Sequence, residues 1–322
     1  MKLRIGTRGS ALARAQAELA AARLRERGYE TELVIVHTRG DADLTSSLAE
    51  IGRGAFTEVF SQMLRRGELD LAVHSAKDMP ADPACDGFWC LPRGDARDAL
   101  LRADGREIVR IGTGSPRRAS AVHRMYPAAQ VLPVRGNVDT RIRKMLSGEF
   151  DALVLAAAGL DRLHIRAEGF SVERIPVTQC VPAACQGIIA LEGAPGACIH
   201  DAAAGEAARI ERAAQRALGG SCTGGAGCYF DGSVLYLQYE GRIAALPCRC
   251  ATAWCTTVSS TRAYSGSCAA TACASSSESA RGHMRRRRRR STRSCADVPR
   301  NTRSPCASRG AIPSYSAGAA RN

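Results

Sequence analysis

Four segments of the chain place basic or polar residues between a predicted strand and a predicted helix. They span residues 7–10, 73–80, 112–118 and 134–141, and each contains an arginine or a lysine. Ligands of α/β proteins bind at the edge where the carboxyl ends of strands meet the starts of helices. The segments therefore predict a groove lined by basic side chains, which suits a ligand with several carboxylates or phosphates. Neither a P-loop nor a dinucleotide glycine fingerprint accompanies them, so a nucleotide is less favoured.

Segment 112–118 gives the strongest of these signals. Ser115 suits a helix N-cap and Pro116 suits the first helical position, so a helix should begin there. Arg117 and Arg118 then fall in the first turn, where the helix dipole disfavours positive charge. This conflict favours the binding of an anion over a solvent-exposed charged face, which is the alternative.

Two other turns each allow two interpretations. Lys77 and Asp78 follow a predicted strand, where they could form a surface ion pair. Asp78 could instead stabilise a cation and move protons at the sheet edge. Ser10 suits a helix N-cap, and Arg8 beside that helix start would form a carboxylate pocket.

The fourth turn and a glycine-rich loop supply further candidates. Arg135 lies at the turn and Arg141 on the following helix, with an ion pair to Asp139 as the alternative. Cys222 lies in a Gly-Gly-Ser-Cys-Thr loop, where it could be a nucleophile, a covalent anchor or a small buried apolar residue. No histidine-containing constellation indicates a cysteine protease. The six histidines show no metal-ligand spacing, so we expect no metal site.

Strands and helices alternate along the first 240 residues. The apolar pattern predicts strands over 3–7, 31–37, 70–74, 109–113, 131–134, 152–157 and 234–239, and helices over 11–25, 56–66, 116–125, 139–146 and 202–218. Such alternation predicts parallel sheets with right-handed crossovers. It weakens over 82–99 and near 176–182, where we expect the chain to cross between two α/β lobes.

The net charge of +14 comes almost entirely from the last part of the chain. Residues 247–322 contain 14 arginines, six of them consecutive, but two acidic residues and seven of the 14 cysteines. This part shows no hydrophobic periodicity, which indicates either a disordered basic arm or, as we prefer, a frameshifted reading of a GC-rich gene. Nucleic-acid binding would rest on the arginine run alone. No leader or membrane-length apolar run is present in the sequence, so we expect a reduced, cytoplasmic protein.

The ordered set of motifs resembles the porphobilinogen deaminase family over about residues 1–240. Each string is weak alone, but their order is specific to that family. The matching strings are Thr-Arg-Gly-Ser-Ala-Leu-Ala at 7–13, Thr-Arg-Gly-Asp at 38–41, Val-His-Ser-Ala-Lys-Asp-Met-Pro at 73–80, Gly-Thr-Gly-Ser-Pro-Arg-Arg at 112–118, Arg-Gly-Asn-Val at 135–138 with Thr-Arg at 140–141, Ala-Ala-Gly-Leu at 157–160, Pro-Ala-Ala-Cys-Gln-Gly at 182–187 and Gly-Gly-Ser-Cys at 219–222.

The resemblance implies an α/β fold with two lobes like those of periplasmic solute-binding proteins and a small α/β third domain. The implied limits are 1–92 with about 186–204 for the first domain, 93–185 for the second and 205–246 for the third. That third domain is incomplete here, because residues 247–322 do not resemble the family.

The resemblance also implies the chemistry. The family condenses four porphobilinogen molecules head to tail, with release of ammonia, into the linear tetrapyrrole hydroxymethylbilane. A dipyrromethane cofactor would be attached through Cys222, and Asp78 would be the catalytic carboxylate. The residues implied to hold the cofactor are Lys77, Asp78, Thr113, Ser115, Arg117, Arg118 and Arg141, and those implied to bind substrate are Arg8, Ser10, Phe56, Arg135, Arg162 and Gln186.

A second function stays open at this point. A non-catalytic anion-binding protein could use the same two-lobed scaffold, although the Cys222 loop argues against it. The family resemblance implies a monomer that acts on porphobilinogen, with neither a membrane nor a specific nucleic acid as partner. Mass spectrometry under denaturing conditions would separate the two functions, because a covalent dipyrrole survives unfolding and a reversibly bound anion does not.

Overall fold

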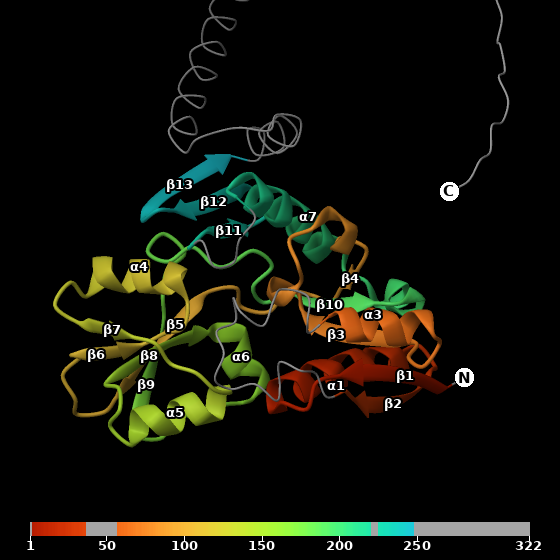
Figure 1. Ribbon diagram of the computed structural model, residues 1–322, viewed down its shortest axis with the longest axis horizontal. Coiled ribbons are helices and arrows are strands. Elements are labelled where there is room, and N and C mark those ends of the chain that lie inside the picture. The colour runs from red at the N-terminus through yellow and green to blue at the C-terminus, as the bar shows by residue number, and fades with distance from the viewer. Residues whose placement is uncertain (1, 37–56, 220–224, 248–322) are drawn as a thin grey trace, which may run out of the picture. The chain divides into compact units, whose positions relative to one another are not determined.

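The computed structural model describes residues 2–36, 57–219 and 225–247 (Figure 1). A first sheet of five strands has the order β2 (Glu30–Ile35), β1 (Lys2–Thr7), β3 (Leu71–Ser75), β10 (Ile189–Glu192) and β4 (Trp89–Cys90). β1 is parallel to β2 and β3, whereas β10 is antiparallel to β3 and β4. Helix α1 (Ala11–Glu26) packs its alanines and Leu24 against Leu3, Ile5 and Leu71 of this sheet. Helix α3 (Glu58–Arg65) packs Phe60 against Ala72, which points to the other face.

A second sheet of five strands has the order β7 (Gln130–Leu132), β6 (Arg110–Gly112), β8 (Ala152–Ala156), β5 (Asp98–Ala103) and β9 (Phe170–Arg174). Here β6 is parallel to β7 and β8, and β5 is antiparallel to β8 and β9.

Two helices cover opposite faces of the second sheet because successive strand side chains alternate between faces. Leu100 packs with Val122 of α4 (Pro116–Met125), whereas its neighbour Leu101 packs with Met145 of α5 (Val138–Leu146). Figure 1 shows α4 and α5 on the two sides of these strands. A shorter helix, α6 (Ala157–Arg162), follows β8 directly.

The two sheets share one topology. In each sheet, the first of three parallel strands lies between the second and the third. An antiparallel strand, β10 or β5, pairs with the third, and one more strand, β4 or β9, lies at the edge beyond it. The predicted α/β class is thereby confirmed. The alternation of strands and helices predicted the parallel half of each sheet, but β4, β5, β9 and β10 were missed because no helix separates them in the regular way.

A third sheet is formed by β11 (Gly227–Phe230), β12 (Val234–Tyr239) and β13 (Arg242–Pro247), which pair as an antiparallel meander. Helix α7 (Ala202–Ala217) precedes it and begins at Asp201, whose carboxylate accepts the N–H of Ala204 at 2.8 Å. The predicted helix at 202–218 and strand at 234–239 are confirmed. The domain limits stay a prediction, and residues 248–322 lie outside the described part of the chain.

Three short 3₁₀ helices complete the described elements: η1 (Ala76–Asp78), η2 (Pro83–Cys85) and η3 (Ala194–Ile199). Within the described ranges, every helix is too short or too polar to cross a membrane.

Glu211 of α7 is a buried charge that joins the third sheet to the rest. Its carboxylate accepts hydrogen bonds from Arg93 at 2.6 and 3.2 Å, from Cys185 N–H at 2.6 Å and from Phe230 N–H at 2.7 Å. The guanidinium of Arg93 also lies over the ring of Tyr229, 4.7 Å from its centroid. One carboxylate therefore satisfies donors from three separate segments.

We expect Glu211→Ala to destabilise the fold strongly. The substitution leaves the Arg93 guanidinium and two buried N–H groups without their acceptor, which costs about 3–5 kcal/mol. The urea midpoint, followed by circular dichroism, measures the loss. Glu18→Ala is the control, because the Glu18–Arg25 ion pair is exposed on α1 and its removal should leave the midpoint nearly unchanged.

Candidate functional site

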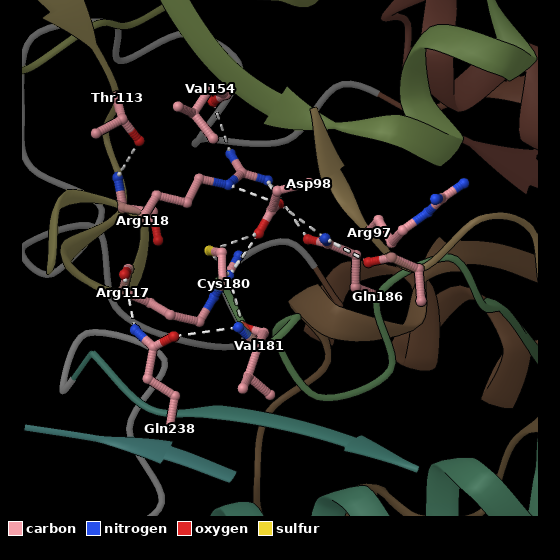
Figure 2. A network of polar contacts seen from close by, with 12 residues as sticks. Arg97, Asp98, Thr113, Arg117, Arg118, Val154, Cys180, Val181, Gln186 and Gln238 are labelled. Carbon is pink, nitrogen blue, oxygen red and sulfur yellow. Dashed lines mark hydrogen bonds and ion pairs between the residues drawn. The ribbon is translucent and has the colours of Figure 1, made fainter. Parts of the chain in front are cut away.

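Asp98, the first residue of β5, is a fully buried carboxylate held by two arginines of α4. Its Oδ2 accepts a hydrogen bond from Arg117 Nη1 at 2.5 Å, and its Oδ1 accepts from Arg118 Nε at 2.9 Å and Nη2 at 2.8 Å. Both arginines are themselves buried, with 3% and 7% of their surfaces exposed. Figure 2 shows the two side chains reaching the same carboxylate from one helix turn.

Gln186 and Cys180 complete the surroundings of Asp98. Gln186 Nε2 donates to Asp98 Oδ1 at 2.9 Å and to Ala96 O at 2.8 Å, and the Cys180 thiol donates to Asp98 Oδ2 at 3.2 Å. Burial opposes ionisation of Asp98, but Arg117 and Arg118 outweigh it and hold the pKa of this carboxyl well below its usual range. Burial also raises the pKa of the Cys180 thiol to about 12, so this cysteine stays protonated.

Helix α4 starts at the residue that the sequence predicts, but without the capping hydrogen bond expected there. Ser115 and Pro116 take the N-cap and first helical positions as predicted, yet the Ser115 side chain makes no capping hydrogen bond. Instead the Ser115 N–H donates to Oγ1 of the buried Thr113 at 3.3 Å. Arg117 and Arg118 form neither a solvent-exposed face nor a simple ligand site, because their guanidinium groups pair with an internal carboxylate. Their contact with a ligand stays a prediction.

Lys77 and Arg141 bring further positive charge to this cluster. Burial lowers the pKa of the half-buried Lys77 ammonium to about 8, with Asp78 acting in the opposite direction and Arg118 in the same one. The half-buried Arg141 donates from Nε to Gly136 O at 2.7 Å, and burial together with Arg118 lowers its pKa.

The structure thus brings together four of the predicted basic residues and two carboxylates. We call this set the cationic cluster: Lys77, Asp78, Asp98, Arg117, Arg118 and Arg141. Its cations outnumber its carboxylates, so the site as described favours an added anion. Arg117 Nε is buried and finds no hydrogen-bond partner among the described residues. The surplus of positive charge and the unpartnered Arg117 Nε both suit a ligand with acidic side chains, such as dipyrromethane.

The other predicted residues divide by what surrounds them. Ser10 caps α1 by accepting the Ala13 N–H at 3.3 Å, so its N-cap assignment is confirmed. Arg8 beside it is half-buried, and Arg135 is exposed.

Arg162 and Gln186 have internal partners. Arg162 Nη2 donates to Gly187 O at 2.5 Å, and burial lowers the pKa of this guanidinium to about 10. Gln186 is 1% exposed and points into the Asp98 network (Figure 2), so its predicted contact with substrate would require displacement of an internal bond. Phe56 and Cys222 lie outside the described residues.

Asp98 was missed by the sequence reasoning, although a signal was present. It stands directly before the apolar residues Ala99, Leu100 and Leu101, and an acidic residue at the start of a buried strand requires a cationic partner. The adjacent arginines of segment 112–118 were the available partners.

The first described residue after the Cys222 loop, Gly225, lies near the start of α4. Gly225 follows Cys222 by three residues, and a Cβ built on Gly225 would lie 3.9 Å from both Arg117 N and Pro116 Cβ.

Sequence similarity to known proteins shows which family the chain belongs to. The family model described as "Porphobilinogen deaminase, dipyromethane cofactor binding domain" matches residues 3–197. The chain belongs to the porphobilinogen deaminase family. The porphobilinogen deaminase of Corynebacterium efficiens is 43% identical over 199 residues, which cover 60% of this chain and 66% of that protein. The probable porphobilinogen deaminase of Methanocella arvoryzae is 40% identical over 243 residues, covering 70% of this chain and 79% of that one. The match to the Mycobacterium leprae porphobilinogen deaminase is 38% over 257 residues, covering 75% and 80%.

The solved structures that match the chain include solute-binding proteins. An ancestral cationic amino acid solute binding protein is 16% identical with a TM-score of 0.38, covering 60% of this chain and 83% of that one. Substrate binding domain 2 of Lactococcus lactis GlnP is 12% identical with a TM-score of 0.38, covering 68% and 90%. These scores are too low to support an argument.

We expect Asp98→Asn to destabilise the protein in a pH-dependent way. At pH 7 the variant leaves two buried guanidinium groups without their counter-charge, a loss of about 3–5 kcal/mol. Because the folded pKa of Asp98 is lowered, its contribution is fully present above the unfolded carboxyl pKa of about 3.9 and is lost as the pH falls below it.

Urea unfolding of the wild type and the variant between pH 7 and pH 3 measures this difference. The gap in unfolding free energy should narrow below about pH 4. Asp104→Asn, at an exposed position, is the matched control. A gap that stays constant with pH would show that Asp98 is not ionised in the folded protein.

Proposed function

We propose that this protein is a monomeric cytoplasmic transferase that joins four porphobilinogen molecules head to tail into hydroxymethylbilane. The supporting observation is the cationic cluster, whose residues come from η1, β5, α4 and α5 and lie within the part matched by the family model. A growing polypyrrole bears acidic arms on every ring, which is the kind of ligand that a surplus of arginine and lysine favours. The domain division 1–92 with about 186–204, 93–185 and 205–246 is part of this proposal.

Asp78 is the residue we propose to carry the chemistry. Each cycle forms a carbon–carbon bond between the aminomethyl carbon of porphobilinogen and the free α-carbon of the preceding ring. The carbon–nitrogen bond breaks, ammonia leaves, and the α-carbon loses a proton. Asp78 is exposed at the end of η1 beside Lys77, where its carboxylate can stabilise the cationic pyrrole left by ammonia and then accept the proton.

Lys77, Arg117, Arg118 and Arg141 are the residues we propose to hold the acidic groups of a dipyrromethane cofactor, together with Thr113 and Ser115. When bound, the cofactor supplies the pyrrole ring to which the first substrate unit is joined. Arg8, Ser10, Phe56, Arg135, Arg162 and Gln186 are proposed to bind substrate. Among the last group, Arg162 and Gln186 make internal hydrogen bonds that substrate would have to displace.

Covalent attachment through Cys222 predicts a permanent change in mass. The mass of the intact chain, measured under denaturing conditions, should exceed the mass calculated from the sequence by that of one dipyrromethane. Cys222→Ala should abolish this increase. Cys198→Ala is the control, because Cys198 is an exposed cysteine outside the Cys222 loop. A wild-type chain that condenses porphobilinogen without any added mass would contradict covalent attachment, and reversible anion binding would add no mass either.

Substitution of Asp78 should separate catalysis from folding. Asp78→Asn keeps the shape of the side chain and removes its charge, so circular dichroism and cofactor mass should be unchanged. A group that stabilises developing charge supplies a factor on the order of 10³, and kcat should fall by about that much. Asp82→Asn, four residues on in the N-cap of η2, is the matched control. A twofold loss for Asp78→Asn would reduce it to a surface ion pair with Lys77.

A further inference from the structure

Gln238 of β12 joins the third sheet to the cationic cluster. Its side chain is fully buried, its Nε2 donates to Arg117 O at 2.9 Å, and its Oε1 accepts the Val181 N–H at 3.1 Å. Figure 2 shows the amide reaching from the third sheet to the backbone of Arg117 and Val181. A buried amide with both ends satisfied by backbone groups fixes the distance and the orientation of the two segments that it joins.

Gly227 makes this approach possible. It pairs with Gln238 across β11 and β12, so the two residues face the same neighbouring segments. A Cβ on Gly227 would lie 2.5 Å from Val181 O and 3.1 Å from Arg117 Cδ, closer than a real side chain tolerates. The next residue, Cys228, donates its N–H to Pro182 O at 2.9 Å. The pair Gly227 and Gln238 therefore holds the first turn of α4 at contact distance.

Arg117 is consequently fixed from two directions. Asp98 holds its guanidinium from the second sheet, and Gln238 holds its carbonyl from the third sheet. Its peptide is the point at which the strand that follows the Cys222 loop meets the helix that presents two arginines. Any slip of β11 along Val181 would move one relative to the other.

We propose that Gln238 is a positioning residue for the condensation reaction, acting through Arg117. With Gly227, it sets the register between the third sheet and the basic groups that receive the acidic arms of the polypyrrole. The inference rests on the proposed function, since it assumes that the third sheet carries the attached cofactor. Gln238 touches neither substrate nor reacting atoms in this role, and it differs from ordinary core packing because its loss should misplace a site in a chain that is still folded.

The test compares Gln238→Met with wild type in the full chain. Methionine is close in size and removes both hydrogen bonds. At a temperature where circular dichroism shows both proteins folded, the fraction of chains carrying the dipyrromethane mass should fall about fivefold to tenfold. In the loaded fraction kcat should fall about tenfold or more while KM for porphobilinogen changes less than about twofold, because misplacement by about 1 Å lowers rate without removing the substrate-binding groups.

Two further variants keep the outcome decisive. Gln130→Met makes the same change at an exposed position of β7 and should match wild type. If Gln238→Met does not fold, Gln238→Glu is read in the same way, and at low pH its protonated carboxyl regains a donor for Arg117 O, so loading should recover. A folded Gln238 variant with wild-type loading and wild-type kcat would overturn the inference alone. A wild-type chain that carries no added mass and does not condense porphobilinogen would overturn the proposed function, and the inference with it.

Discussion

The buried carboxylate of Asp98 is the constraint on which the rest of the site depends. An ionised carboxyl group inside a protein is costly unless cations and hydrogen bonds surround it, and here it has two guanidinium groups, an amide and a thiol. These donors come from α4 and from the segments around residues 180 and 186, so one charge fixes three parts of the chain relative to β5. The same pairing explains how α4 tolerates two arginines in its first turn, since Asp98 supplies the negative charge that the helix dipole favours there.

Asp98 does not neutralise the cluster that it organises. Lys77 and Arg141 lie within electrostatic reach of Arg118, and both have pKa values lowered by burial and by that neighbouring charge. Like charges held together without enough counter-charge destabilise the folded chain, and an anionic ligand relieves that cost when it binds. The arginines therefore satisfy an internal carboxylate and leave the cationic cluster with a surplus of positive charge, to which we propose that an anionic ligand binds. A site built this way is held in place before the ligand arrives, which lowers the entropy lost on binding.

The sequence predicted the parts of the fold that follow local rules. Periodicity located α1, α4, α7 and the parallel strands, and the cap positions of Ser10 and Ser115 located the starts of α1 and α4, because these signals lie within a few residues of the element that they define. The antiparallel strands β5 and β10 follow no local alternation, since each is placed by its pairing with a distant strand. The candidate site shows the same division. Lys77 and Arg118 were predicted because they lie in turns between a strand and a helix. Asp98 carries no such local signal, since its importance depends on which distant cations pair with an acidic residue at the start of a buried strand.

The partnership of Arg117 with both Asp98 and Gln238 has a consequence for how the third sheet contributes to function. The Asp98 network lies within residues 98–186, so its contacts do not require the third sheet to be in place. The hydrogen bond from Gln238 is different, because it forms only when β11 and β12 have docked on Val181 and Pro182. The third sheet therefore contacts the first turn of α4 through the backbone carbonyl of Arg117, and not through a charged group. A hydrogen bond to this carbonyl affects the position of α4 but not the protonation of its arginines. We therefore infer that Asp98 balances the charge of the two guanidinium groups, whereas Gln238 fixes the position of the helix that carries them.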